Sequence, residues 1–271
     1  MNKTAASGDA ASAGQPCPLL IVNLNDTLAG LARRRGVLAE WIAHGLGLPD
    51  SRLRVVDPRG GAELPAHEGL AGVVVSGSVA MVTDCRDWSQ RVAAWLAQVV
   101  AANVPVLGIC YGHQILAHAI GGCVSYNPNG QEYGTVEIRL LPAAKDDPLL
   151  SHLPAVFHAQ AIHSQSVIRL PDGAVRLAEN DHDRHQAFRV GKCAWGVQFH
   201  PEFDVDIVRS LARARDAGLR AEGLDPDAIS AAARETPQAA SVLARFAKFV
   251  DGSGTDAVLR PSVSVSTPRP A

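Results

Sequence analysis

Residues 105–114 read Pro-Val-Leu-Gly-Ile-Cys-Tyr-Gly-His-Gln. The run begins with the apolar pattern of a buried strand, and residues 114–120 continue with the spacing of a helix. A strand that turns into a helix within so few residues needs a tight turn, for which Gly108 and Gly112 leave room. We expect this turn to push Cys110 into solvent at a helix N-terminus, where partial positive charge favours the thiolate. The alternative is a buried, structural cysteine in an ordinary α/β turn.

Strand and helix patterns alternate on the N-terminal side of this stretch. Buried-strand patterns cover residues 19–24, 52–56 and 71–75. Apolar residues recur at helical spacing around residues 37–42 and 88–100. Such alternation predicts an α/β fold with a mostly parallel central sheet and helices on both faces.

The pattern changes after Gly122. Residues 135–140 alternate with period two, as in a half-exposed strand. Further short strand candidates are separated by turn residues and lie at 156–157, 166–170, 174–178 and 187–190. We expect these strands to form a small antiparallel β elaboration at one edge of the sheet. A buried strand returns at 194–199, and two C-terminal helices follow, the last beginning near Thr236 and Pro237.

Both ends of the chain have compositions typical of disorder. Residues 1–16 are small and polar, and residues 251–271 mix Gly, Ser, Pro and Thr. We therefore expect a disordered N-terminal segment (1–16), one domain (17–250) and a flexible C-terminal tail (251–271).

Composition narrows the class of protein. The 25 Lys and Arg nearly balance the 27 Asp and Glu, which gives no general attraction to nucleic acid or membranes. Five dispersed cysteines without a Cys-x-x-Cys pair argue against a disulfide framework or structural zinc and favour a reducing, cytoplasmic location. The longest apolar runs are too short to cross a bilayer. The ten histidines show no metal-ligand spacing, so we expect no metal site.

A second informative stretch is Val197-Gln198-Phe199-His200-Pro201-Glu202. In an extended chain, residues two apart project to the same side, so His200 and Glu202 can lie next to each other. A carboxylate beside an imidazole orients the ring and stabilises its protonated form, and the imidazole can then accept a proton from a thiol. A lone His-Pro-Glu is a weak signal, but here it follows a buried strand in a chain that already offers Cys110.

The two stretches together resemble the paired signature of class I (triad) glutamine amidotransferases. The match is residue by residue at Gly108–Gln114 and again at Gly196–Glu202. It is most similar to free-standing members of the group that includes the GMP synthase glutaminase domain and gamma-glutamyl peptidases. The resemblance implies a flavodoxin-like three-layer fold over about residues 18–205, and more loosely through the C-terminal helices.

The resemblance also implies roles for individual residues. Cys110 would be the nucleophile, His200 the base that activates it, and Glu202 the residue that orients His200. Backbone N–H groups at Gly77 and Tyr111 would form the oxyanion hole. For the amino-acid end of the substrate, the resemblance implies contacts from Gln114 and from the backbone of the segment with Ser164 and Gln165.

Two segments depart from the family pattern. The loop at residues 75–80 has one glycine, Gly77, where many relatives have a Gly-Gly-Pro type of sequence, and Ser78 fits there only if its φ is negative. Gln165 stands where the family's His-x-Asp-x-Val segment has an aspartate. A neutral side chain at this position weakens selection of a free α-amino group, which suggests a substrate other than plain glutamine.

Three functions follow from these residues. The first is a glutaminase that acts through a cysteine γ-glutamyl thioester and passes ammonia to a synthetase in trans, since no nucleotide-binding loop or acceptor domain is evident in the 271 residues. The second is a free-standing hydrolase of γ-glutamyl peptides or amides. The third is a non-catalytic binding or regulatory relative, against which the intact Cys110, His200 and Glu202 argue. None of the three requires a cofactor.

Overall fold

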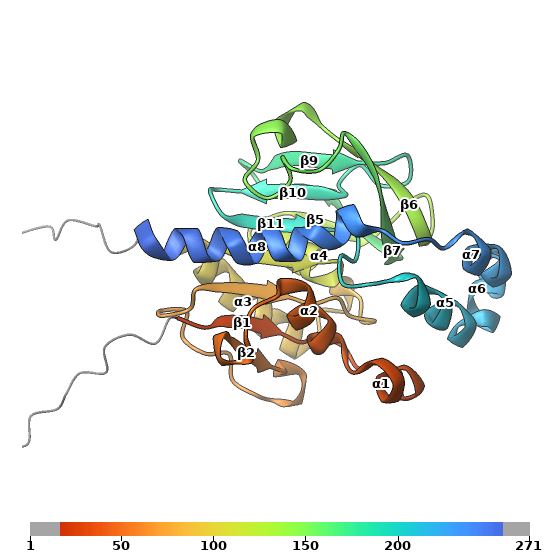
Figure 1. Ribbon diagram of the computed structural model, residues 1–271, viewed down its shortest axis with the longest axis horizontal. Coiled ribbons are helices and arrows are strands. Elements are labelled where there is room, and N and C mark those ends of the chain that lie inside the picture. The colour runs from red at the N-terminus through yellow and green to blue at the C-terminus, as the bar shows by residue number, and fades with distance from the viewer. Residues whose placement is uncertain (1–16, 257–271) are drawn as a thin grey trace, which may run out of the picture.

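A nine-stranded mixed sheet forms the centre of the protein (Figure 1). The computed structural model describes residues 17–256. Five adjacent strands are parallel, in the order β2 (Leu53–Val56), β1 (Leu19–Val22), β3 (Gly72–Val75), β4 (Val106–Ile109) and β11 (Ala194–Val197). Four antiparallel strands extend the sheet beyond β11, namely β10 (Ala187–Val190), β9 (Val175–Glu179), β6 (Glu132–Leu140) and β7 (Val156–His163). The predicted parallel core with an antiparallel extension at one edge is confirmed.

One predicted strand of the extension lies elsewhere. The strand expected at 166–170 is β8 (Gln165–Arg169), which pairs with β5 (Cys123–Tyr126) in a separate two-stranded sheet. Only Ser164 separates β8 from β7, so the chain turns out of the main sheet at that residue. The short β5, with mixed polar and apolar residues, carried too weak a pattern to be predicted.

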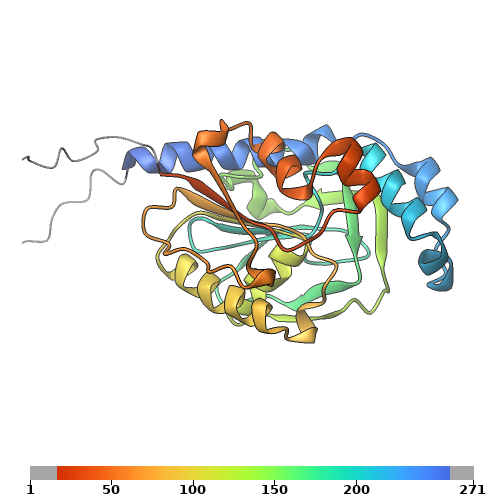
Figure 2. The same ribbon diagram turned by 90° about the horizontal axis from the view of Figure 1, so that it is seen from below.

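Helices cover both faces of the sheet, as Figure 2 shows with α8 on one side and α3 on the other. The first layer contains α2 (Leu38–Leu46) and α8 (Pro237–Asp256), and the second contains α3 (Asp87–Ala101) and α4 (Tyr111–Ala119). Successive side chains of β1 point to opposite faces of the sheet. Leu19 and Ile21 belong to the core under α2 and α8. Leu20 and Val22 belong to the core under α3 and α4. Period-two strands between apolar helix faces therefore explain the three layers.

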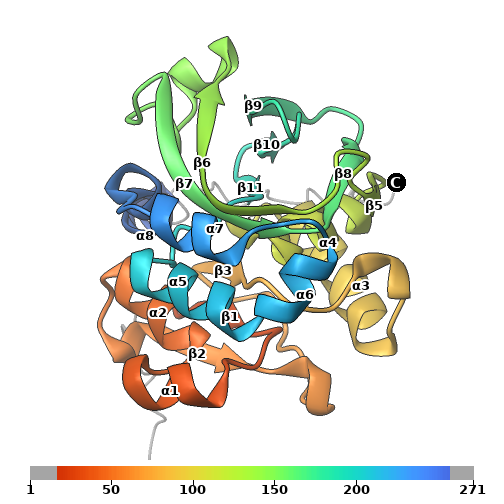
Figure 3. The same ribbon diagram turned by 90° about the vertical axis from the view of Figure 1, so that its right-hand side faces the viewer.

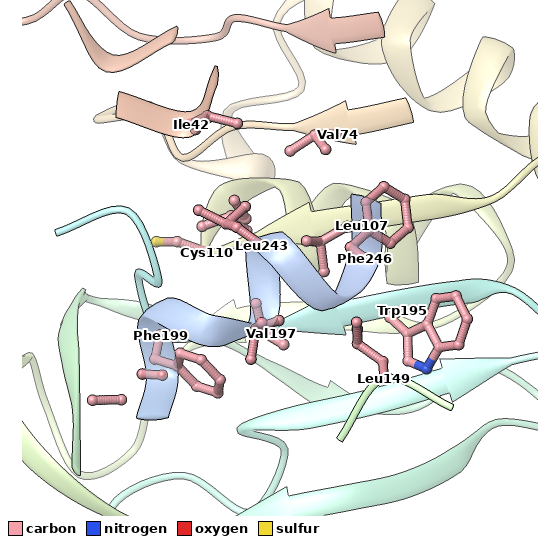
Figure 4. Packing of buried hydrophobic residues seen from close by; sticks show 14 of the residues in the cluster. Ile42, Val74, Leu107, Cys110, Leu149, Trp195, Val197, Phe199, Leu243 and Phe246 are labelled. Atoms are coloured by element: carbon pink, nitrogen blue, oxygen red, sulfur yellow. The ribbon is translucent and has the colours of Figure 1, made fainter. Parts of the chain in front are cut away.

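The core under α8 is densely filled. Leu243 and Phe246 of this helix are fully buried and lie over the sheet residues Leu107, Val197 and Trp195 (Figure 4). The ring of Phe246 meets that of Trp195 edge to face, at 6.3 Å between centroids. This packing ties the C-terminal helix to β4 and β11, the two strands that lead into the candidate site.

Shorter helices lie together at the end of the sheet where the parallel strands finish (Figure 3). They are α1 (Ala29–Arg35), α5 (Val205–Ala214), α6 (Asp216–Ala221) and α7 (Pro226–Ala232). Four 3₁₀ turns complete the described elements, namely η1 (Asp50–Arg52), η2 (Pro58–Gly60), η3 (Val82–Asp84) and η4 (Pro142–Asp146). Functional side chains in parallel sheets gather at this carboxyl end.

The C-terminal boundary differs from the expected one. Helix α8 continues through Asp256 rather than ending at residue 250. Asp251, at the start of the expected tail, is held by Arg52, whose Nη2 lies 2.8 Å from the carboxylate. The expected N-terminal segment (1–16) and the rest of the tail (257–271) lie outside the described residues.

Candidate active site

Neighbouring parallel strands bring Cys110 and His200 together although ninety residues separate them in the chain. Strands β4 and β11 pair with Ile109 opposite Val197, and the Cys110 N–H donates to the Val197 carbonyl at 2.9 Å. Cys110 follows β4 directly, and His200 comes shortly after β11. Both side chains therefore arise at the carboxyl end of the same part of the sheet.

The turn around Cys110 is as tight as the sequence predicts. Cys110 has φ 52° and ψ −102°, a conformation that non-glycine residues rarely adopt, and α4 begins at the next residue. A Cβ on Gly108 would lie 2.4 Å from the Gly112 carbonyl oxygen, and one on Gly112 would lie 2.2 Å from the Val75 carbonyl oxygen. Both glycines are thus required by close backbone approach.

The expectation of a solvent-exposed thiol is wrong. Cys110 is only 5% exposed, and its Sγ lies 3.5 Å from the carbonyl oxygen of Ile162, at the end of β7. The strained turn does project the side chain out of the sheet. The space into which it projects is enclosed by β7, by the loop at Gly77 and by His200, which the local sequence around Cys110 could not reveal.

His200 and Glu202 form a buried hydrogen-bonded pair. Nδ1 of His200 lies 2.8 Å from Oε1 of Glu202, and the imidazole stacks on the ring of Phe203 with centroids 4.0 Å apart and planes 3° apart. Burial disfavours the charged ring, but the negative charges of Glu202 and Cys110 and hydrogen bonds with both raise the pKa of His200 to about 10. The geometry therefore favours an imidazolium at His200, next to Cys110.

The loop after β3 lies against both of these side chains. A Cβ on Gly77 would come within 2.8 Å of His200 Cε1 and 3.7 Å of Cys110 Cβ. The Ser76 hydroxyl accepts from Leu24 N at 2.8 Å and donates to the Gly77 carbonyl at 2.9 Å, which fixes the loop from the side of β1. Ser78 is not among the non-glycine residues with positive φ in the described chain, so its φ is negative, as a serine at this position requires.

Tyr111, expected to supply the second oxyanion donor, is the first residue of α4. Backbone N–H groups in a first helical turn have no partner within the helix and point toward its N-terminal end, where Cys110 lies. The Tyr111 side chain points toward the neighbouring helix α3, where its hydroxyl is 2.6 Å from Ser89 Oγ. Only the backbone of Tyr111 is therefore available to the site.

The three residues expected to bind substrate form hydrogen bonds within the protein. Gln114 is buried and donates to the Gln165 carbonyl at 2.7 Å and to Gln198 Oε1 at 3.0 Å. The Gln165 side chain accepts from Val82 N at 3.0 Å and donates to Thr83 Oγ1 at 2.5 Å. These bonds tie β8 to η3.

Ser164 lies between β7 and β8 and is only half-buried. Its carbonyl accepts from Asn127 N at 2.9 Å, and its hydroxyl contacts the Gln131 amide at 3.2 Å. Of the three predicted substrate-binding residues, it is the least enclosed by protein contacts.

Sequence reasoning missed two side chains close to the site. Phe203, which stacks on His200, is aromatic and lies three residues further along the chain, a spacing that carries no signal by itself. Glu132 is an acid buried in β6, in the part of this strand that precedes the predicted residues 135–140. A carboxylate inside an otherwise half-apolar strand is unusual, so Glu132 could have been predicted from the sequence as a candidate functional residue.

Residues 17–256 show neither a metal-binding cluster nor a membrane span. No three His, Cys, Asp or Glu side chains within this range lie together as ligands of a metal ion would. No helix within it has the length and apolar character needed to cross a membrane.

Comparisons with known proteins identify the family of the chain. The model of the family described as glutamine amidotransferase class-I matches residues 38–207. The glutamine-hydrolysing GMP synthase of Thermosipho africanus is 39% identical over 105 residues, which cover 38% of this chain and 20% of that protein. A separate glutamine-hydrolysing GMP synthase subunit from Methanopyrus kandleri is 32% identical over 153 residues, which cover 54% of this chain and 77% of that protein.

The fold is also found in solved structures. A glutamine amidotransferase from Methylobacillus flagellatus has a TM-score of 0.67 and 22% identity, over 94% of this chain and 100% of that chain, which is a likeness of fold. The chain spans 20–25% of the length of four curated GMP synthases that it matches. Because the family model covers more than half of the chain and the Methanopyrus kandleri relative is matched over most of its length, the chain belongs to the class-I glutamine amidotransferase family.

Proposed function

We propose that the protein hydrolyses the γ-carboxamide of glutamine through a γ-glutamyl thioester on Cys110, releasing glutamate and ammonia. The observation that carries this proposal is the meeting of Cys110 with the buried His200–Glu202 pair at the ends of β4 and β11, in a chain of this family. A thiolate beside an imidazolium is the state required for attack on an amide carbon.

The first half of the reaction forms the thioester. The Cys110 sulfur attacks the carboxamide carbon, and the oxyanion that develops is held by backbone N–H groups of Tyr111 and of the loop at Gly77. His200 gives its proton to the nitrogen as the C–N bond breaks, so that ammonia leaves and the γ-glutamyl group stays on sulfur. Glu202 keeps the ring oriented and compensates its charge.

The second half releases the product. His200, now neutral, takes a proton from a water molecule as that water attacks the thioester carbon. The C–S bond breaks, glutamate leaves, and the thiolate–imidazolium pair is restored. The stacking of His200 on Phe203 favours one ring orientation for both proton transfers.

The experiment compares two cysteine variants in an assay of ammonia and glutamate release from glutamine. Cys110→Ala is expected to reduce turnover to the background. Cys193→Ala is the matched control, because Cys193 is also buried but its Sγ contacts the Asn103 carbonyl at 3.3 Å, away from the site, and this variant should keep activity. Retained turnover in Cys110→Ala would refute the mechanism.

A second candidate function is the hydrolysis of γ-glutamyl peptides or amides. Gln165 favours it, because this side chain is neutral and is already hydrogen bonded to Val82 and Thr83, leaving no carboxylate there to select a free α-amino group. Parallel assays with glutamine and γ-glutamyl dipeptides decide between the two. A dipeptide kcat/KM well above that for glutamine would favour the peptidase, and the reverse would favour the glutaminase.

The proposal includes a partner and a location. Relatives named as separate subunits of glutamine-hydrolysing GMP synthases support a synthetase in trans as the acceptor of ammonia. Adding such a synthetase should raise glutamine hydrolysis if the two act together. All five cysteines are free thiols, which supports a reducing cytoplasm as the place of action.

A further inference from the structure

A second buried imidazole lies close to Cys110. The side chain of His163, the last residue of β7, is 1% exposed, and that of Glu132, on the neighbouring β6, is 6% exposed. His163 Nε2 is 2.8 Å from Glu132 Oε2, and His163 Nδ1 is 2.9 Å from the Gln165 carbonyl oxygen. Both ring nitrogens therefore face oxygen atoms that accept hydrogen bonds.

This arrangement determines the protonation of the pair. A neutral imidazole has one N–H, so it could satisfy only one of the two acceptors. Two N–H groups satisfy both, which makes the ring an imidazolium beside an ionised Glu132. Amide donors support that ionised carboxylate, since Asn180 Nδ2 donates to Oε1 at 2.6 Å and Gln186 Nε2 donates to Oε2 at 2.7 Å.

The electrostatic balance gives the same answer. Burial lowers the pKa of His163, but the hydrogen bond and the charge of Glu132 outweigh it, and the net shift is upward. Burial raises the pKa of Glu132, but His163 and the two amides outweigh it, and the net shift is downward. A buried ion pair whose remaining lone pairs are satisfied in this way is a stable arrangement once formed.

The surroundings of this pair include the nucleophile. Ile162, the residue before His163, contributes the carbonyl oxygen that lies 3.5 Å from Cys110 Sγ. Negative charge on Cys110 and, to a smaller extent, on Asp183 raises the pKa of His163. The ring of His182 meets that of His163 edge to face at 6.3 Å between centroids.

A third histidine near the pair carries no charge. Burial, with smaller contributions from the charges of His185 and His163, lowers the pKa of His113 to about 3, so His113 is neutral at physiological pH. His200 and His163 both interact electrostatically with Cys110, and each is paired with its own buried glutamate.

We propose that His163, anchored by Glu132, is a positioning residue for the Cys110 nucleophile. It holds the backbone of residues 162–165 against the sulfur, and its fixed positive charge offsets the Ile162 carbonyl dipole, which would otherwise oppose a thiolate. The inference rests on the proposed function, in which that thiolate attacks the substrate. It predicts that removing the charge at position 163 leaves Cys110 in place but less ionised.

The test follows the alkylation rate of Cys110 by iodoacetamide as a function of pH. The Cys110 peptide is quantified by mass spectrometry, because Cys17 and Cys85 are exposed and react as well. In Glu132→Gln, His163 loses the carboxylate that keeps its buried ring protonated and becomes neutral, so the midpoint of the alkylation profile should move to higher pH by about one unit. In the same variant, kcat for glutamine should fall more than KM rises.

The control is Gln186→Ala, which removes one donor to Glu132 but leaves both charges in place. A purely structural role of the network predicts equal shifts in Gln186→Ala and Glu132→Gln, whereas a charge role predicts a clear shift only in the latter. If Glu132→Gln folds poorly, the double variant Glu132→Gln with His163→Gln removes both charges and leaves no unpaired buried ion. The midpoint of the Cys110 alkylation profile should also rise in this double variant.

Unchanged midpoints in the folded variants would overturn the inference. This outcome is distinct from failure of the proposed function, which is tested by turnover in Cys110→Ala. Alkylation measures the thiol without any substrate, so the protein could fail to hydrolyse glutamine while the shift in Glu132→Gln still establishes the role of the pair.

Discussion

Substitution of Gly77 by alanine tests how closely the loop after β3 is fitted to the active site. The added Cβ would lie 2.8 Å from His200 Cε1, whereas ordinary contacts begin near 3.4 Å. One of the two groups must therefore move by about 0.6 Å. His200 cannot move freely, because it is bonded to Glu202 at 2.8 Å and stacked on Phe203 at 4.0 Å.

The expected effect is on catalysis rather than on folding. A misplacement of about 1 Å among reacting groups costs roughly 100-fold in rate, so a shift of about half that size should lower kcat/KM by about 10- to 100-fold. This loss corresponds to roughly 1.4 to 2.7 kcal/mol of transition-state stabilisation. Gly77 does not have a positive φ, so alanine adds no backbone strain, and Tm should change by less than about 3 °C.

The assay measures kcat and KM for glutamine together with thermal unfolding. Gly60→Ala is the matched control, because a Cβ there meets nothing within 4 Å and the residue lies in a 3₁₀ turn away from the site. Gly77→Ala with the wild-type kcat/KM would refute the argument that the loop and His200 are in tight contact. A large fall in Tm would show instead that the loop matters for folding.

Three further predictions concern other positions. Gly112→Ala places a methyl carbon 2.2 Å from a carbonyl oxygen of β3 and should strongly destabilise the protein or prevent folding, as measured by urea denaturation. Phe246→Ala empties a fully buried site and should cost about 3–5 kcal/mol in the same experiment. Because Glu202 and Cys110 raise the pKa of His200 from 6.5 to about 10, its contribution to the free energy of unfolding is complete below about pH 6.5 and lost as the pH rises through 10. In Glu202→Gln, the free energy of unfolding should fall less steeply over this pH range. A fall as steep as in the wild type would contradict the prediction.

Much of the fold could be predicted because its elements are short and strongly patterned. The strand that leads to Cys110 and the strand at 187–190 were recognisable from local apolar runs. The separate sheet of β5 and β8 was not, because pairing of Tyr126 with Gln165 depends on how the chain turns at Ser164, and no local pattern encodes that turn. In the part of α8 past residue 250, Asp251 pairs with Arg52, a contact between residues 199 positions apart that no local pattern predicts.

The sequence by itself predicted which residues are the candidates for the reaction. A cysteine between two glycines at a strand-to-helix turn, and a histidine two residues before a glutamate, are local patterns whose chemistry follows from residue type and spacing. The tertiary structure alone decided their environment. Pairing of β4 with β11 brings Cys110 to His200, and the approach of β7 encloses the sulfur and adds the His163–Glu132 pair. Burial and charge at a site arise from segments distant in sequence, so no local stretch could have revealed them.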